Sequence, residues 1–343
     1  MDAQRQFPDV HWIWAGGISF VYEVHPRIVV KVAKSGEFER GQFRKELKVY
    51  EIFSQHTPCL SVVQCFFYSD NGITLESMRD MVTKVEKLEL LALRREWMND
   101  LARAVALLES LNLAHGDLQP ENILLDRDRV KLSDFDCTAE IGTDFEACMA
   151  PYGRILNVNE TDQGGRGTPS SVGPRTEQFA LGSLYNLINY GFEVYGDRRL
   201  TEDPREHGPK VVDLLQDMEY PKLNGDPLID DITDKCWHNK YATVAELAAH
   251  TKRFLVEGTN SESTFVRWRT AIGRIVQEFW TAANSDLVNG REPNGDSRDE
   301  LDHDHPAGEF LSKKAFCQDL EKRGLPCLLC SGEPEQLGFT FDW

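Results

Sequence analysis

The stretch HGDLQPENILLDRDRVKLSDFD, residues 115–136, gathers side chains that could act on a phosphate group. Asp117 offers a carboxylate that could orient an acceptor hydroxyl. Asn122 and Asp134 offer oxygen ligands of the kind that Mg²⁺ takes in proteins. Transfer of a phosphoryl group from a nucleotide needs a base, a metal site and a cation that grips the phosphates. The stretch therefore predicts a site for phosphoryl transfer.

A short hairpin must position the two metal ligands, because ILLDRDRVKLS lies between them and its pairing would bring Asn122 close to Asp134. Upstream, the first eighty residues read mostly as strand, with one helical segment between two strand pairs. The strands are SFVYEV, RIVVKVA, SVVQCFFY and GITLESM, and the helical segment is GEFERGQFRKELKVYEIFSQ. From about Leu88 the hydrophobic period predicts helices instead.

The second half of the chain carries further helix signals. Asp226 before Pro227 predicts a helix start, as does the sequence TVAE at residues 243–246. Apolar residues at helical spacing predict a docked helix within residues 257–285, with a partner-binding face as the alternative. Residues 286–308 are acidic and rich in Gly and Asn, which predicts a flexible linker. A last helix and tail should occupy 309–343.

The composition argues against several classes of function. The formal net charge is -18, so that nucleic acid or an anionic membrane surface would be repelled, and we expect neither as a partner. No apolar run approaches the length of roughly 18 residues that suggests a membrane span, and the N-terminus lacks a signal-peptide pattern. The eight Cys residues are spaced irregularly, as in proteins with reduced thiols. These features favour an intracellular protein, cytoplasmic or nuclear, and leave its oligomeric state open.

The motifs resemble those of the protein kinase-like superfamily. HGDLQPEN is similar to the catalytic loop H-R-D-L-x-x-x-N, and DFD is similar to D-F-G. IVVKVA resembles the strand that carries the kinase lysine, and TEQFALGS and KCW resemble segments of the kinase C-lobe. The wording of HGDLQPEN, LSDFDCTAEIG and TEQFALGS looks most like that of kinase-like proteins from filamentous fungi. The resemblance covers about residues 10–256.

This resemblance implies an α+β, two-lobed fold in which ATP lies between the lobes. A β-rich N-lobe with one helix would span 10–78, and a mainly helical C-lobe would span 79–256. Lys31 would hold the phosphates and pair with Glu46, and Asp117 would orient the acceptor hydroxyl. Asn122 and Asp134 would hold Mg²⁺. The other residues that would contact the nucleotide are Gly16, Gly17, Val21, Glu76, Met78 and Leu124.

Several positions depart from the family pattern. Gly116 replaces the Arg of H-R-D, so that activation by phosphorylation of the activation loop is not expected. Kinases without this Arg are called the non-RD type. Gln119 stands where serine/threonine kinases carry Lys, and Asp136 replaces the Gly of D-F-G. Trp14 and Ser19 take two of the positions of the Gly-rich loop. These changes leave open whether the activity is full or low.

The sequence supports three hypotheses about function. The first is an ATP- and Mg-dependent protein kinase that phosphorylates Ser or Thr in an unidentified protein. The alternatives are a small-molecule kinase that resembles aminoglycoside phosphotransferases, and a pseudokinase scaffold that binds nucleotide weakly. At the level of single residues, Asp117 and Asn122 could instead stabilise a turn, and Lys31 with Glu46 could be a surface ion pair. Cys327 and Cys330 more plausibly remain free thiols than bind zinc.

Overall fold

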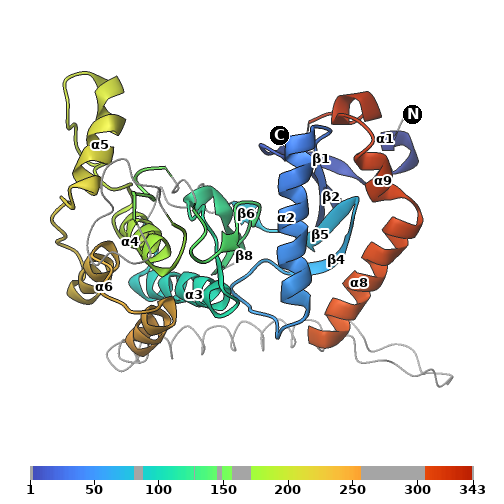
Figure 1. The fold of residues 1–343 in the computed structure, drawn as a ribbon. Helices are drawn as coiled ribbons and strands as arrows, with labels where there is room; N and C mark the ends of the chain where they lie inside the picture. The colour runs from blue at the N-terminus through green and yellow to red at the C-terminus, as the bar shows by residue number, and fades with distance from the viewer. Residues whose placement is uncertain are drawn as a thin grey trace, which may run out of the picture.

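The computed structural model describes residues 3–80, 88–126, 128–144, 149–156, 171–255 and 306–341. They form the α+β, two-lobed fold that the sequence predicts (Figure 1). Strands and one long helix make up the N-lobe, and helices dominate the C-lobe. The expected helix at 257–285 and residues 286–305 of the expected linker lie outside the described residues.

The N-lobe is built on a five-stranded antiparallel sheet of order β1-β2-β3-β5-β4. Its strands are β1 (His11–Ala15), β2 (Ser19–His25), β3 (Ile28–Ala33), β4 (Cys65–Ser69) and β5 (Gly72–Glu76). In β3 the side chains alternate between the two faces, as a strand requires. Val30 and Val32 are fully buried in the cluster on one face, whereas Lys31 pairs with α2 on the other. Both faces of this sheet are therefore covered.

Helix α2 (Glu37–Ser54) covers the face that carries Lys31. Its buried side chains follow helical spacing, and they are Phe43, Glu46, Val49 and Tyr50. Phe43, Val49 and Tyr50 belong to a hydrophobic cluster that extends to Val29 and Leu75 of the sheet and into the C-lobe. The single buried carboxylate on this apolar helix face thereby points at the β3 lysine.

The C-terminal segment covers the opposite face of the sheet (Figure 1). It comprises α8 (Pro306–Lys322), α9 (Leu325–Leu329) and the short helix η4 (Pro334–Leu337), followed by residues up to 341. Leu320, Leu325 and Leu329 are buried in one cluster with Phe20 and Tyr22 of β2. The chain end also reaches β1, where Phe341 forms a parallel bridge with Trp12.

The tail packs on the N-lobe, although the expected kinase-like domain ends at residue 256. The sequence predicts a C-terminal helix and tail over 309–343. In the structure, side chains of the tail complete the N-lobe core, together with Ala3 and Phe7 from the N-terminus. Helix α8 also begins at Pro306, within the expected linker. The N-lobe is thus assembled from both ends of the sequence.

The C-lobe is mainly helical, with short strands where it meets the N-lobe. Its long helices are α3 (Leu91–Ser110), α4 (Pro174–Tyr190), α5 (His207–Gln216), α6 (Pro227–Trp237) and a helix over residues 244–255. Strands β6 (Arg79–Asp80), β8 (Ile123–Asp126) and β9 (Arg129–Leu132) form one small sheet, and β7 (Leu113–Ala114) pairs with β10 (Ala139–Glu140). The remaining short helices are α1 (Ala3–Gln6), η2 (Pro120–Asn122) and η3 (Pro204–Glu206). Asp226 caps α6, because its side chain accepts from the N–H groups of Leu228 and Ile229, as the sequence predicts. No helix in the described part is long and apolar enough to cross a membrane.

Candidate active site

A buried lysine links the two lobes through two carboxylates. Lys31 Nζ lies 2.7 Å from Glu46 Oε2 on α2 and 2.6 Å from Asp134 Oδ1 in the segment after β9. The lysine and Glu46 are 7% and 0% exposed, so that this is no surface ion pair. The structure therefore places three of the expected site residues in direct contact.

The triplet has two carboxyl groups but only one ammonium group, so that the positive charge cannot balance two negative charges. Burial alone would lower the pKa of Lys31, but Glu46 and Asp134 together raise it above its ordinary value. Burial raises the pKa of Glu46 to about 7, although Lys31 opposes the shift and Asp134 adds to it. Burial would raise the pKa of Asp134 as well. The attraction of Lys31 outweighs burial, so that the pKa of Asp134 is lowered. Lys31 therefore stays charged, whereas the charged form of Glu46 is the one that is disfavoured.

The hairpin of β8 and β9 brings the loop with Asp117 to Asp134. Ile123 lies opposite Leu132 in this hairpin, and the backbone N–H of Ser133 donates to the carbonyl oxygen of Asn122 at 2.9 Å. Asn122 and Asp134 therefore flank one short hairpin, as the sequence predicts. Asp134 has a φ of 60°, a left-handed conformation that is uncommon for a residue with a side chain and that recurs at active sites.

The side chain of Asp117 is held by two amides of its own loop. Asn122 Nδ2 donates to Asp117 Oδ2 at 2.9 Å and to its backbone oxygen at 2.8 Å, and Gln119 Nε2 donates to Oδ2 at 3.0 Å. The bond to the backbone shows that Asn122 also stabilises the loop. Because the amide nitrogen of Asn122 is used in this way, its Oδ1 is the atom suited to bind a cation.

A buried carboxylate on α4 binds the backbone of the same loop. Glu177 accepts hydrogen bonds from the backbone N–H groups of His115 at 2.9 Å and Gly116 at 3.2 Å. Gly116 has a φ of 79°, which glycine adopts without the strain that a side chain brings. In the sequence, Glu177 stands in the segment TEQFALGS, which resembles part of the kinase C-lobe. Its contact with residues 61 and 62 positions away carries no local sequence signal.

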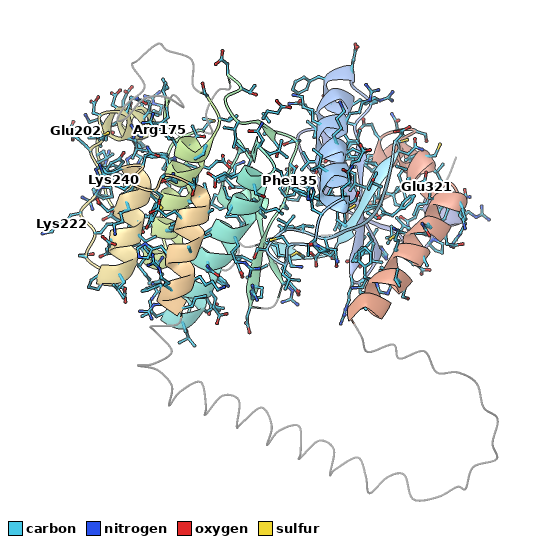
Figure 2. The ribbon with its side chains drawn as sticks, turned by 60° about the horizontal axis from the view of Figure 1, so that its bottom comes forward. Phe135, Arg175, Glu202, Lys222, Lys240 and Glu321 are labelled. Carbon is cyan, nitrogen blue, oxygen red and sulfur yellow. The ribbon has the colours of Figure 1, made fainter. Side chains whose placement is uncertain are left out.

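Aromatic packing connects the loop, the Asp134 segment and α2. The ring of Phe135 is fully buried at the junction of the lobes (Figure 2) and lies 5.4 Å from His115, 5.5 Å from Tyr50 and 5.2 Å from Phe53. His115 packs against Phe135. Its Nε2 contacts the Ser133 carbonyl at 2.9 Å, so that its role in the described structure is structural.

The expected nucleotide contacts lie on β2, β5, β8 and the segments next to them. Gly16 and Gly17 form the loop between β1 and β2, and a side chain at Gly17 would meet open space. Val21 lies opposite Lys31 in the β2–β3 pair and packs on the same cluster as α2. Glu76 ends β5, and its carboxylate accepts from Lys131 Nζ at 2.6 and 2.7 Å. Met78 follows it, and Leu124 lies on β8 of the C-lobe; both are half-buried.

The donor set fits a magnesium ion that is bound together with a nucleotide. Mg²⁺ is held in such sites by one or two carboxylates and by substrate phosphates. Asp134 and Asn122 would each offer one oxygen ligand to such an ion. Asp136 is a further carboxyl group nearby, and burial first and the Asp134 carboxylate second raise its pKa. Among the described residues, no group of three or more His, Cys, Asp or Glu side chains forms a metal site of its own, Cys327 and Cys330 included.

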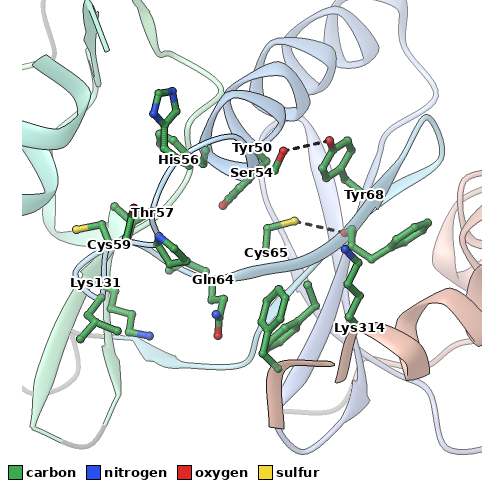
Figure 3. A pocket seen from close by; sticks show the side chains of 18 of the residues that line it. Tyr50, Ser54, His56, Thr57, Cys59, Gln64, Cys65, Tyr68, Lys131 and Lys314 are labelled. Atoms are coloured by element: carbon green, nitrogen blue, oxygen red, sulfur yellow. Dashed lines mark hydrogen bonds between the residues drawn. The ribbon is translucent and has the colours of Figure 1, made fainter. Parts of the chain in front are cut away.

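A cavity of about 710 Å³ lies away from these residues, between the loop after α2, β4 and α8 (Figure 3). Tyr50, Cys65 and Lys314 line it, whereas Lys31, Asp117 and Asp134 do not. The candidate active site is therefore defined by its side-chain contacts and not by cavity size.

The comparisons with known proteins cover the residues of this site. A model of the protein kinase domain matches residues 15–152, which include the β1–β2 loop, Lys31, Glu46, Asp117 and Asp134. This part of the chain is therefore similar to the protein kinase domain. The match ends at residue 152, yet α4, α6 and the helix over 244–255 complete a helical C-lobe behind it.

Curated serine/threonine-protein kinases are similar to this protein kinase domain. Testis-specific serine/threonine-protein kinase 1 of Homo sapiens is 22% identical over 280 residues, which cover 72% of each chain. Serine/threonine-protein kinase crk1 of Schizosaccharomyces pombe is 28% identical over 171 residues, 48% of this chain and 50% of that protein. Probable serine/threonine-protein kinase iksA of Dictyostelium discoideum is 25% identical over 201 residues, 50% of this chain and 20% of that protein. These organisms do not support the expected likeness to filamentous fungi in particular.

Proposed function

We propose that this chain is an ATP- and Mg-dependent protein kinase that phosphorylates serine or threonine hydroxyls. The observation that carries the proposal is the buried triplet of Lys31, Glu46 and Asp134, which joins β3, α2 and the segment after β9. A scaffold has no need to bury a lysine between two carboxylates, because such a group is costly to desolvate. A site that must hold phosphates and a metal does need these groups.

Each residue has a separate task in the proposed reaction. Lys31 would bind the phosphates, and Glu46 would keep its ammonium in place. Asp134 and Asn122 would hold Mg²⁺, which when bound supplies positive charge to the reacting phosphates. Asp117 would accept a hydrogen bond from the acceptor hydroxyl and so aim its oxygen at the terminal phosphate. In the described structure Asp134 contacts Lys31, so that nucleotide and metal would replace part of this contact.

Gly116 supports a kinase that needs no phosphate on its activation segment. The position that normally supplies an arginine here has no side chain, and its backbone is fixed to Glu177. The backbone of the loop is thus held by a carboxylate of α4, a contact that needs no added phosphate group. We therefore assign the chain to the non-RD type.

The relatives support a protein acceptor, because their names are those of serine/threonine-protein kinases. One observation favours the pseudokinase alternative. Gln119 Nε2 and Asn122 Nδ2 both donate to the same oxygen of Asp117, which occupies part of its capacity to accept a hydrogen bond from a substrate. An active enzyme would have to use the other carboxylate oxygen or release Gln119.

A transfer assay with radiolabelled ATP tests the proposal. Wild type and Asp117→Ala are incubated with Mg²⁺ and with generic protein acceptors in one arm, and with aminoglycosides in the other. We expect label on serine and threonine of the protein acceptors from the wild type alone. Label on aminoglycosides alone would replace the proposal with a small-molecule kinase, and no transfer in either arm would leave the scaffold.

A further inference from the structure

The end of the chain contacts the strand that leads into the glycine loop. Phe341 forms a parallel β-bridge with Trp12 of β1, and the two rings lie 4.8 Å apart at an interplanar angle of 75°. Trp12 in turn meets Phe20 of β2 edge-on at 6.1 Å. Phe341 therefore joins a row of aromatic rings that crosses both strands of the hairpin around Gly16 and Gly17.

Strand β1 needs this support, because it lies at the edge of the sheet. Its only neighbouring strand in the five-stranded sheet is β2, and their register shifts between Trp12 and Trp14. An edge strand with an irregular ladder is held by fewer hydrogen bonds than a central strand. Any contact on its free side thus has a large share in fixing its position.

The body of the tail is itself firmly attached to the N-lobe. Phe339 packs on Tyr22 with ring centroids 5.1 Å apart, and Phe310 packs on Phe66 at 5.7 Å. The buried leucines of α8 and α9 lie in the same cluster as β2 and β3. Phe341 therefore belongs to a segment that is packed on the N-lobe, and it can restrain the strand that it touches.

The two faces of the hairpin are coupled by the alternation of side chains along a strand. Trp12 and Phe20 belong to the cluster on the tail side of the sheet, whereas Ile13 and Val21 pack on the cluster that includes α2. A shift of Trp12 would move Ile13 and the following loop on the side of Lys31. The tail can thus influence the loop without contacting it.

We propose that Phe341 is a positioning residue for the loop with Gly16 and Gly17, and that the C-terminal tail thereby sets the affinity for the nucleotide. The second part of this inference rests on the proposed kinase function. The first part concerns only the hairpin and can be measured without nucleotide.

Amide hydrogen exchange of the nucleotide-free protein tests the first part. We compare wild type, Phe341→Ala, Phe341→Tyr and a matched control, Phe316→Ala, whose ring touches His25 at the other end of β2. In Phe341→Ala the amides of residues 12–20 should exchange about two- to tenfold faster, the range expected when one aromatic pair is lost. Phe341→Tyr should restore the protection, and Phe316→Ala should leave it unchanged. Equal exchange in Phe341→Ala and the wild type, or equal acceleration by both alanine variants, would overturn the proposal.

Steady-state kinetics test the second part. Phe341→Ala should raise the KM for ATP about two- to tenfold while kcat stays within about twofold, because the reacting groups are untouched. A loss of kcat with an unchanged KM would overturn the positioning role. If the wild type neither binds ATP nor transfers phosphate, the proposed function fails, whereas the exchange of residues 12–20 still decides whether Phe341 positions the hairpin.

Discussion

At the scale of single residues, the candidate site depends on three charged side chains that the fold brings together. Lys31, Glu46 and Asp134 lie far apart in the sequence but in direct contact in space. Two contacts escaped prediction. Gln119 was expected to weaken catalysis by lacking charge, and the structure shows it bonded to Asp117. Glu177 holds the backbone of the catalytic loop, and such a long-range bond leaves no local pattern in the sequence.

Lys31→Met should abolish phosphoryl transfer while the fold remains. Methionine keeps most of the apolar length that packs in β3 and removes the charge that would bind phosphate. We expect kcat/KM to fall at least about a hundredfold, the scale for one electrostatic stabiliser of a transition state. Glu46→Gln should give a smaller loss, and the double variant should be no worse than Lys31→Met alone. Additive losses in steady-state assays would show that the two residues act independently.

Asp134→Asn should weaken the binding of Mg-ATP more than that of ATP without metal. The amide keeps the shape of the side chain and can still accept a bond, but it lacks the negative charge that a divalent cation needs. Isothermal titration in Mg²⁺ and in a chelator measures the difference. The assignment of Asp134 as a metal ligand fails if the affinity drops by the same factor in both conditions.

The buried carboxylate of Glu46 should make stability fall as the pH rises. Its pKa is raised from 4.5 to about 7 in the folded chain, so that the folded state binds more protons than the unfolded state between these values. The free energy of unfolding of the wild type should therefore decrease across this window relative to Glu46→Gln, which has no titrating group there. Urea denaturation of both proteins at several pH values measures it, and parallel profiles would show that Glu46 keeps its ordinary pKa.

At the scale of elements, the local patterns predict strands and helices well but not where the tail docks. β-rich runs indicate the strands of the sheet, and helical spacing and caps indicate α2, α6 and the last helix within a few residues. The docking of α8 and α9 on β2 and β3 joins residues nearly three hundred positions apart, for which the sequence offers no pattern beyond scattered leucines and phenylalanines. An acidic stretch before them suggested a separate tail, whereas burial of those leucines makes it part of the N-lobe.

Two leucines on α8 distinguish these interpretations. Leu320 is 5% exposed in the cluster with β2, and Leu311 is 64% exposed on the same helix. Leu320→Ala should lower the free energy of unfolding by about 2–5 kcal/mol, because it leaves a cavity in a packed core. Leu311→Ala should change it by less than about 0.5 kcal/mol. Chemical denaturation measures both, and equal small effects would restore a tail that is separate from the N-lobe.

At the scale of the whole molecule, the N-lobe sheet lies between α2 and the C-terminal segment, with the active site on the side of α2. Glu46, Tyr50 and Phe53 of this helix contact Lys31 and Phe135, so that α2 joins the sheet to the Asp134 segment. The tail fixes the other face. The two ends of the sequence thus build the frame in which residues 31, 46 and 134 meet.

The central claim is that this frame transfers the terminal phosphate of ATP, with Asp117 orienting the acceptor. The most direct measurement compares wild type and Asp117→Ala in two assays, Mg-ATP binding by calorimetry and transfer of radiolabel to a protein acceptor. We predict that binding stays within about threefold and that the transfer rate falls about 10²- to 10⁴-fold, because Asp117 acts on the acceptor and not on the nucleotide. Equal transfer by both proteins, or binding without any transfer by the wild type, would contradict the account.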